Sequence, residues 1–283
     1  MNTARSRIAR LISVLALVVM SAPDQAPAQE RAVIRVKGSN VMAGMVDALG
    51  KSFMKDHPNT TVVISGGGRE AGLKGLFDKT AEVVMSSRRM GRELDVNAAK
   101  HGLTLVERLI GWDGVALITH PKNPVKDLSI DQVAKIFTGE YNTWSEVGGP
   151  ESLIILYVAE TPRSGTGEFF KEFCLKGVPY SKGANTRRYS RYVVKSVAEM
   201  EEAIGYASLA EALRAQSKKL IKIMGIRTTP EAEAEAVVAS RRTVDDRSYP
   251  LIRPLYLFYD SRSASKEVKE FVKHCANKGL GLE

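Results

Sequence analysis

Short β-rich runs alternate with amphipathic helical patterns along most of this chain. Clusters of β-branched and aromatic residues predict strands at 34–36, 60–65, 83–85, 115–119, 153–158, 203–206, 220–224 and 251–258, the last of them disturbed by Pro254. A 3.6-residue apolar period predicts helices at 43–54, 73–77, 130–137, 169–175, 210–215, 231–239 and 265–278. This alternation is typical of α/β proteins built on a largely parallel sheet.

The first 28 residues have the features of a secretory signal peptide. Three arginines precede an apolar run at 11–20, and the tripeptide Ala-Pro-Ala that ends at Ala28 fits a small-x-small cleavage site. The run has about half of the roughly 20 residues needed to span a bilayer. We expect cleavage near Ala28 and a soluble periplasmic protein, and an N-terminal anchor is the less favoured alternative because no lipidation cysteine follows the leader.

Size and charge restrict the function further. The leader holds three arginines and Asp24, so its removal leaves 255 residues and lowers the net charge from +9 to +7. A chain of this length can form two lobes. A basic surplus attracts anions to a cleft, although it is also common in soluble proteins. Lysine and arginine are scattered, without a basic arm or interleaved aromatic residues, so we expect no nucleic-acid partner.

The chain has two cysteines, Cys174 and Cys275. They could pair in an oxidising compartment. Each lies in an apolar helical pattern, however, where a buried free thiol is the ordinary finding. We therefore predict two free thiols.

Four polar or glycine-rich turns lie between a predicted strand and the helical segment that follows. They are GSN at 38–40, GGGR at 66–69, SSR at 86–88 and RSGT at 163–166. In open α/β sheets, ligands bind at the carboxyl ends of the strands. The four turns could surround one anion, or they could be four unrelated caps.

The RSGT turn has the chemistry of an anion site. A helix amino terminus leaves N–H groups unpaired and carries partial positive charge. Ser164 and Thr166 add hydroxyls, Gly165 allows close backbone approach, and Arg163 can donate a charge-assisted hydrogen bond. A plain N-cap at Ser164 is the alternative.

Motifs for other chemistry are incomplete. Gly67 and Gly72 resemble part of a Walker loop, but the lysine follows one position late and no Ser or Thr comes after it. The four histidines are isolated, which predicts no metal site. Ser164 lacks the glycine two residues earlier that a nucleophile elbow requires. We therefore expect a binding protein without enzymatic activity, metal or cofactor.

Eight segments resemble the phosphate-binding proteins of Pst-type ABC importers, in the family's order and across nearly the whole mature chain. They are GSN (38–40), GLKGL (72–76), VVMSSRRM (83–90), DGVALITHPKNPV (113–125), IFTGEYNTWSEVGG (136–149), SGT (164–166), AIGY (203–206) and YPLIRPLYLF (249–258). The fifth and eighth are the most specific to this family.

The resemblance implies a two-lobed periplasmic-binding-protein fold of type II, in which each lobe is a mostly parallel sheet flanked by helices. Lobe I would comprise 29–113 plus 250–283, and lobe II would comprise 114–249, after a signal peptide at 1–28. The lobes would close by a hinge motion over a ligand held between them.

The resemblance also implies the ligand-binding residues. We predict that Ser39, Asn40, Val41, Gly68, Arg69, Ser86, Ser87, Arg163, Ser164, Gly165 and Thr166 bind the ligand. The serines, Asn40, Val41, Gly165 and Thr166 match the family's binding turns, whereas Arg69 and Arg163 would supply positive charge from new positions. This chain departs from the family at three of the compared positions: Arg69 replaces a usual serine, Glu160 replaces a usual arginine, and Ser87 stands where some members have an aspartate. Glu160 would have to turn away from a phosphate or be neutralised by Arg69 or Arg163.

We predict a monomeric solute-binding protein that captures an oxyanion, with phosphate as the first expectation, and delivers it to an ABC permease of the inner membrane. Two alternatives remain open from the sequence. The same fold could bind a different anionic or zwitterionic organic molecule, or the chain could serve as a sensor or partner subunit without transport.

Overall fold

The computed structural model describes residues 31–161, 164–229 and 235–280. The chain divides into two compact units, residues 1–30 and 31–283, and everything that follows concerns the second unit. The predicted signal peptide and Arg163 lie outside the described residues.

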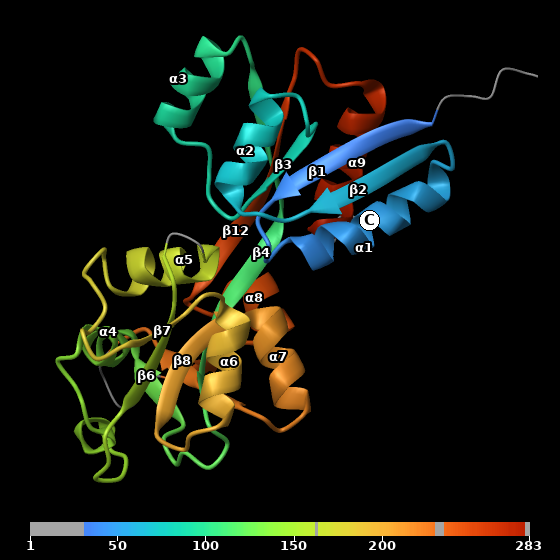
Figure 1. The fold of residues 1–283 in the computed structure, drawn as a ribbon. Helices are drawn as coiled ribbons and strands as arrows, with labels where there is room; N and C mark the ends of the chain where they lie inside the picture. Colours follow the sequence, from blue (N-terminus) through green and yellow to red (C-terminus); the bar gives the residue numbers. More distant parts are fainter. Residues whose placement is uncertain (1–30, 162–163, 230–234, 281–283) are drawn as a thin grey trace, which may run out of the picture. The chain divides into compact units, whose positions relative to one another are not determined.

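A mixed sheet runs through this unit (Figure 1). Its strand order is β2 (Thr60–Ser65), β1 (Ala32–Gly38), β3 (Val83–Ser86), β12 (Ile252–Asp260), β4 (Leu105–Thr119), β8 (Ala203–Ser208), β6 (Ile155–Ala159) and β7 (Asn185–Arg187). The short strand β9 (Lys222–Ile223) pairs with β4. A separate small sheet has the order β11 (Val237–Val238), β10 (Gly225–Arg227) and β5 (Asp127–Ser129).

The outer strands of the large sheet are parallel, and its middle is antiparallel. Strand β1 pairs in parallel with β2 and β3, and β6 pairs in parallel with β7 and β8. Between these groups, β12 pairs antiparallel with β3 and β4. The first part of β4 pairs with β12 up to Gly114, and its second part pairs with β8 from Val115. The long strand β4 therefore joins the two parallel groups.

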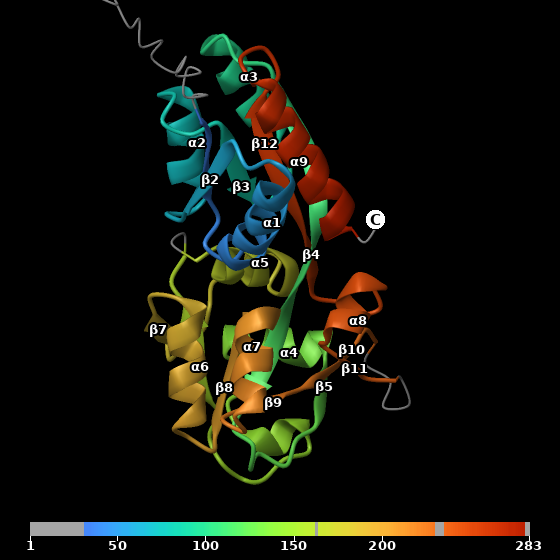
Figure 2. The same cartoon turned by 90° about the vertical axis from the view of Figure 1, so that its right-hand side faces the viewer.

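Helices flank both parallel groups (Figures 1 and 2). They are α1 (Ala43–Asp56), α2 (Arg69–Phe77), α3 (Arg92–Lys100), α4 (Ile130–Thr138), the 3-10 helix η1 (Trp144–Val147), α5 (Gly165–Cys174), α6 (Ser190–Ala198), α7 (Leu209–Ser217), α8 (Arg241–Asp245) and α9 (Lys266–Gly279). Local sequence fixes several starts, for example the capping box at α4, where Ser129 and Gln132 bond each other's backbone.

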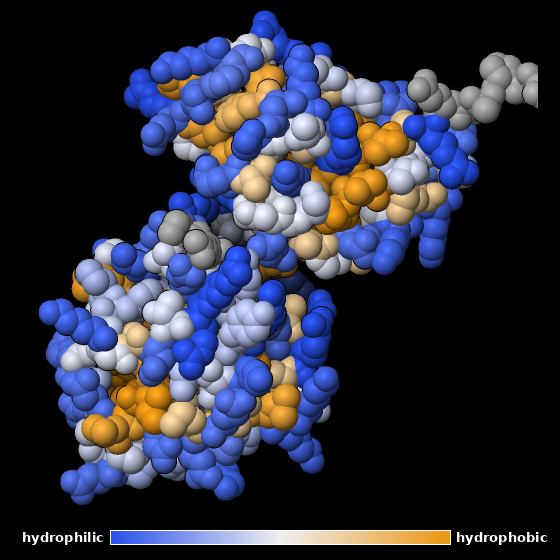
Figure 3. All heavy atoms as spheres, in the orientation of Figure 1, coloured by the Kyte–Doolittle hydropathy of each residue, from blue (hydrophilic) through white to orange (hydrophobic). Residues whose placement is uncertain are grey.

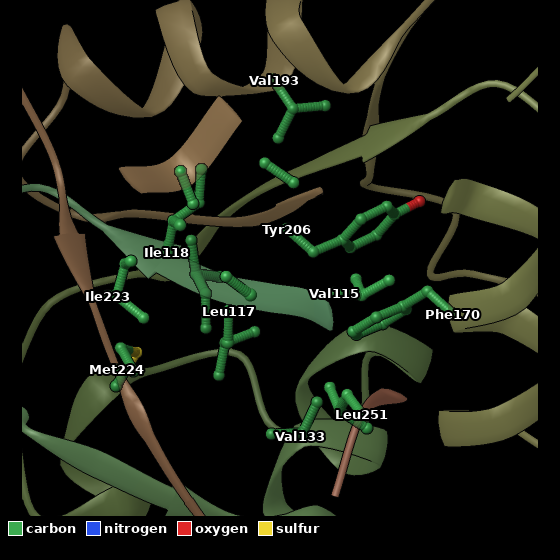
Figure 4. Packing of buried hydrophobic residues seen from close by; sticks show 14 of the residues in the cluster. Val115, Leu117, Ile118, Val133, Phe170, Val193, Tyr206, Ile223, Met224 and Leu251 are labelled. Carbon is green, nitrogen blue, oxygen red and sulfur yellow. The ribbon is translucent and has the colours of Figure 1, made fainter. Parts of the chain in front are cut away.

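Separate hydrophobic cores lie at the two ends of the large sheet. One core packs β4, β6 and β8 against α4 to α7, and its members include Val115, Phe170 and Tyr206 (Figure 4). Another packs β1, β3 and β12 against α1 and α9, and its members include Val36 and Phe271. A smaller third cluster lies under α2 and α3. Each parallel group of strands thus has its own buried apolar support.

The structure corrects parts of the sequence prediction. The predicted helix at 231–239 is wrong where the chain is described, because Val237 and Val238 form β11 against β10; residues 230–234 lie outside the described part. The predicted disturbance at Pro254 agrees with the structure, because Pro254 lies within β12 opposite Trp112 and the β12–β4 register shifts between Leu255 and Tyr256. Helices α3 and α6 were not predicted.

Two further expectations concern the thiols and the membrane. Cys174 in α5 and Cys275 in α9 are free and buried in different cores, so the prediction of free thiols is confirmed. Within the described ranges, the helices fall short of the length and apolar character that a membrane crossing requires.

Candidate functional site

A cavity of about 500 Å³ lies where several strand-to-helix turns meet. Its lining comes from both parallel groups of strands: Ser39, Asn40, Val41, Gly67, Gly68, Arg69, Glu70, Ser87, Arg88, Ser164, Gly165, Thr166, Glu168, Tyr189, Ser190, Arg191 and Glu211. Figure 3 shows that the surface is hollowed between the body that carries α1 to α3 and the body that carries α4 to α7, with mostly hydrophilic residues around the hollow.

The turns after β1 and β2 are joined by direct hydrogen bonds. Asn40 Oδ1 accepts a hydrogen bond from the Gly67 amide at 3.0 Å, and the Gly68 amide donates to the Gly38 carbonyl at 2.9 Å. Gly67 and Gly68 have φ values of 115° and 88°, which side-chain-bearing residues rarely adopt. The glycines therefore let the second turn fold against the first.

The turn after β3 uses its two serines differently. Ser86 is fully buried, and its hydroxyl donates to the Arg88 carbonyl at 2.8 Å and accepts from the Arg88 amide. Ser87 lines the cavity, and a Cβ placed on Gly165 would lie 3.5 Å from Ser87 Oγ. This turn therefore lies beside the start of α5 at the cavity wall.

Ser164 caps α5 and also lines the cavity. Its Oγ accepts a hydrogen bond from the Gly167 amide at 3.3 Å. Ser164 and Thr166 are both almost fully buried, with 6% and 1% of their surface exposed. The cap and the anion-site readings of this turn are compatible, because the cap uses Ser164 as an acceptor and leaves its hydroxyl hydrogen free to donate.

Two tyrosines hold the first turn of α5. Tyr180 Oη donates to the Gly167 carbonyl at 3.0 Å and lies 2.9 Å from Tyr206 Oη. The Tyr206 ring stacks on Phe170 with ring centroids 4.1 Å apart, a contact visible in Figure 4. Burial raises the pKa of both phenols, so both stay protonated. The helix start is thereby fixed to β8.

Several helices begin at the cavity wall. The lining includes residues at or just before the starts of α1, α2, α5 and α6, and Glu211 in the first turn of α7. In the described part of the chain, the N-caps of α1, α2 and α6 contribute no side-chain hydrogen bond to their helices. Capping side chains therefore do not occupy the first amides of these helices, although the amides of Ala43 in α1 and Tyr192 in α6 donate to backbone carbonyls. The helix dipoles add positive potential at the cavity.

The formal charges of the lining cancel. The described lining residues include three arginines, at positions 69, 88 and 191, and three glutamates, at positions 70, 168 and 211. Burial raises the pKa of Glu168, the neighbouring Glu172 and Glu70 carboxylates raise it further, and the guanidinium groups of Arg88 and Arg69 oppose the shift. An anion here would depend on hydroxyls, amides and helix dipoles more than on net charge.

The structure brings most of the predicted site residues together. Nine of the eleven line the cavity: Ser39, Asn40, Val41, Gly68, Arg69, Ser87, Ser164, Gly165 and Thr166. Ser86 does not, because its position at the end of β3 turns its hydroxyl into the local turn. Arg163 lies outside the described residues. Glu160 is not among the lining residues, and its backbone bonds to Arg187 and Ser164.

The predicted site residues did not include part of the lining. The omitted residues are Gly67, Glu70, Arg88, Glu168, Tyr189, Ser190, Arg191 and Glu211, although Gly67 and Arg88 belong to turns that the sequence analysis identified. Tyr189 and Ser190 form another strand-to-helix junction, between β7 and α6, so the same signal existed there. The three-residue strand β7 lacks a β-branched apolar run, which hid the junction.

The lining has no arrangement suited to a metal ion. In the portion of the chain that the structure describes, no group of three or more His, Cys, Asp or Glu side chains could hold one. The hydroxyls, glycine turns and charged side chains of the lining can form hydrogen bonds with a small polar ligand.

Comparisons with known proteins agree on one family. A model of the PBP superfamily domain matches residues 24–277. The phosphate-binding protein PstS of Staphylococcus haemolyticus is 28% identical over 244 residues, covering 84% of this chain and 74% of that protein. PstS of Borreliella burgdorferi is 25% identical over 247 residues, covering 85% and 83%. A phosphate ABC transporter substrate-binding protein from Clostridium perfringens, solved with bound phosphate, superposes with a TM-score of 0.71 at 26% identity, covering 88% of this chain and 96% of that one.

Proposed function

The chain belongs to the PBP superfamily, and from this premise we propose that it captures inorganic phosphate for an ABC importer. It acts as a binding protein and not as an enzyme. The relatives named for phosphate binding cover most of this chain, which supports the same ligand here.

The observation that carries this proposal is the convergence of helix starts and hydroxyls on one cavity. Ser39, Ser87, Ser164 and Thr166 offer hydroxyl groups to its interior, and α2 and α5 start at its wall. A phosphate dianion has oxygen atoms on every side, so it can accept hydrogen bonds from every direction, and its one hydroxyl group can also donate. Hydrogen bonds to a charged group contribute about 1.5–3 kcal/mol each, so several together support tight binding.

We also propose the lobe division and the cellular context. Lobe I would comprise residues 29–113 and 250–283, and lobe II would comprise 114–249, with the phosphate between them. The signal peptide would direct export and would be cleaved near Ala28. The mature chain would act as a monomer in the periplasm and would deliver phosphate to a permease in the inner membrane. The basic-apolar leader supports export.

A second ligand class has one observation in its favour. Glu70, Glu168 and Glu211 line the cavity together with the arginines, which would suit an organic molecule carrying both charges. Native mass spectrometry of freshly purified protein separates the two candidates by the mass of the retained ligand.

Isothermal titration calorimetry in phosphate-free buffer tests the proposal. We expect one site for phosphate and about tenfold weaker binding in Ser39→Ala, which removes a donor from the cavity. Ser52→Ala is the matched control, because Ser52 lies in α1 outside the lining. Absence of heat with phosphate, arsenate and sulfate would overturn the proposal.

A further inference from the structure

Arg253 is a charged residue in the first part of the buried strand β12. It lies in β12 between Ile252 and Pro254, and none of its surface is exposed. Burial of an isolated charge is strongly unfavourable, so a buried arginine requires a partner charge and hydrogen bonds. The partners of Arg253 link β12 to both β4 and α5.

Asp113 of β4 supplies the opposite charge. Arg253 Nε and Nη2 both donate to Asp113 Oδ2, at 3.0 and 2.6 Å. The Asp113 side chain is 14% exposed, so this ion pair is largely removed from solvent. It holds the guanidinium plane in one orientation.

The other side of the guanidinium reaches the first turn of α5. Arg253 Nη1 donates to the Gly165 carbonyl at 2.9 Å, and Nη2 donates to Thr166 Oγ1 at 3.1 Å. Arginine has donors and no acceptor, so the direction of these bonds is fixed. Thr166 Oγ1 is therefore the acceptor, and its own hydrogen remains free.

We propose that Arg253 is a positioning residue of the anion cavity, which fixes the start of α5 and makes the Thr166 hydroxyl a donor to the bound anion. This inference rests on the proposed function. Thr166 lines the cavity, whereas Arg253 does not. Arg253 acts through Thr166 and Gly165. It donates to the Gly165 carbonyl and to Thr166 Oγ1, so that the Thr166 hydroxyl can donate its own hydrogen to the ligand.

A double-mutant cycle on phosphate affinity tests this role. Arg253→Lys keeps the charge opposite Asp113 but loses the planar fork of donors. We expect phosphate to bind at least tenfold more weakly to Arg253→Lys and to Thr166→Val. In the double variant the two losses should not add, because both remove the same oriented hydroxyl. Thr166→Ser keeps the hydroxyl and should retain most of the affinity.

Arg227→Lys is the matched control for loss of an arginine fork. Arg227 Nε donates to Asp127 at 2.9 Å, its side chain is 13% exposed, and it lies outside the cavity lining. This variant should change the melting temperature without changing phosphate affinity.

The outcomes separate this inference from the function on which it rests. A wild-type protein that binds no phosphate overturns both. If the wild type binds phosphate, either of two results overturns the role of Arg253 alone. In the first, folded Arg253→Lys binds phosphate with wild-type affinity; in the second, the losses of affinity in Arg253→Lys and Thr166→Val are additive. If Arg253→Lys does not fold, equal affinity in Thr166→Val and wild type overturns it.

Discussion

Arg88 Nη2 lies 2.7 Å from Glu172 Oε1 and thereby connects the turn after β3 to α5. The same nitrogen lies 3.4 Å from Glu168 Oε2. Arg88 is 39% exposed and Glu172 is 61% exposed, and exposed ion pairs contribute about 0–1 kcal/mol. We therefore expect Arg88 to contribute more to ligand binding in the cavity that it lines than to the stability of the fold.

Arg88→Gln should weaken phosphate binding about tenfold, because it removes one of the three positive charges of the lining. The free energy of unfolding should change by less than about 1 kcal/mol. Arg89→Gln is a control from the adjacent residue, since Arg89 pairs with Glu107 and lies outside the lining. Calorimetry that ranks Arg89→Gln as the weaker binder would contradict this prediction.

Glu168→Gln should be more stable than the wild type at neutral pH. Burial raises the pKa of Glu168, so the folded protein takes up this proton at a higher pH than the unfolded chain. In the wild type, the ionised Glu168 carboxylate destabilises the fold above its folded-state pKa. This destabilisation disappears as the pH falls below the pKa that Glu168 has in the unfolded chain. Melting temperatures measured from pH 8 to pH 4 should therefore converge on acidification.

Glu146→Gln should have the opposite effect and be less stable than the wild type at neutral pH. Hydrogen bonds from the Thr143 and Asn142 amides lower the pKa of Glu146. Its contribution to stability is present above the unfolded pKa and is lost as the pH falls through the folded value. A constant gap between Glu168→Gln and wild type at every pH, with Glu146→Gln behaving as described, would exclude the assigned role of Glu168.

Gly68→Ala should reduce both stability and phosphate affinity. Gly68 has φ 88° and ψ 168°, a conformation that costs other residues about 1–3 kcal/mol, and it lines the cavity before α2. Gly102→Ala is the matched control, because Gly102 has φ 71°, open space for a Cβ and no place in the lining. Gly102→Ala should lose stability without losing phosphate affinity. Unchanged phosphate affinity in Gly68→Ala would argue against a role for the turn after β2 in binding.

The two thiols should react only after unfolding. Burial raises the pKa of Cys174 and Cys275, so neither forms the reactive thiolate at neutral pH. Titration with Ellman's reagent should count none in the native protein and two in denaturant. A count of zero in denaturant would indicate a disulfide and contradict the structure.

The local signals of the sequence were sufficient for the strand-to-helix turns after β1, β2 and β6. The run before Gly66 predicts β2, and the glycines after it predict a turn, because both depend on neighbouring residues. The same local reasoning predicted α9 to within one residue at each end; in the structure Ser265 is its N-cap. Residues that adopt their structure through distant partners escaped it.

Three structural features depend on contacts between residues that are distant in the sequence. Strand β7 is polar and exists through its pairing with β6, so the adjacent start of α6 was missed. Val237 and Val238 form a strand because β10 lies beside them. Arg253 reaches the first turn of α5 through hydrogen bonds to residues that are 87 and 88 positions distant in sequence. None of these pairings leaves a local pattern.

Crystals of the protein grown with arsenate locate the bound anion, because arsenic gives an anomalous signal. We expect one strong anomalous peak within hydrogen-bond distance of the turns at 38–41, 66–69 and 164–166. A saturated protein with no peak among these turns, or with its peak elsewhere, would contradict this expectation.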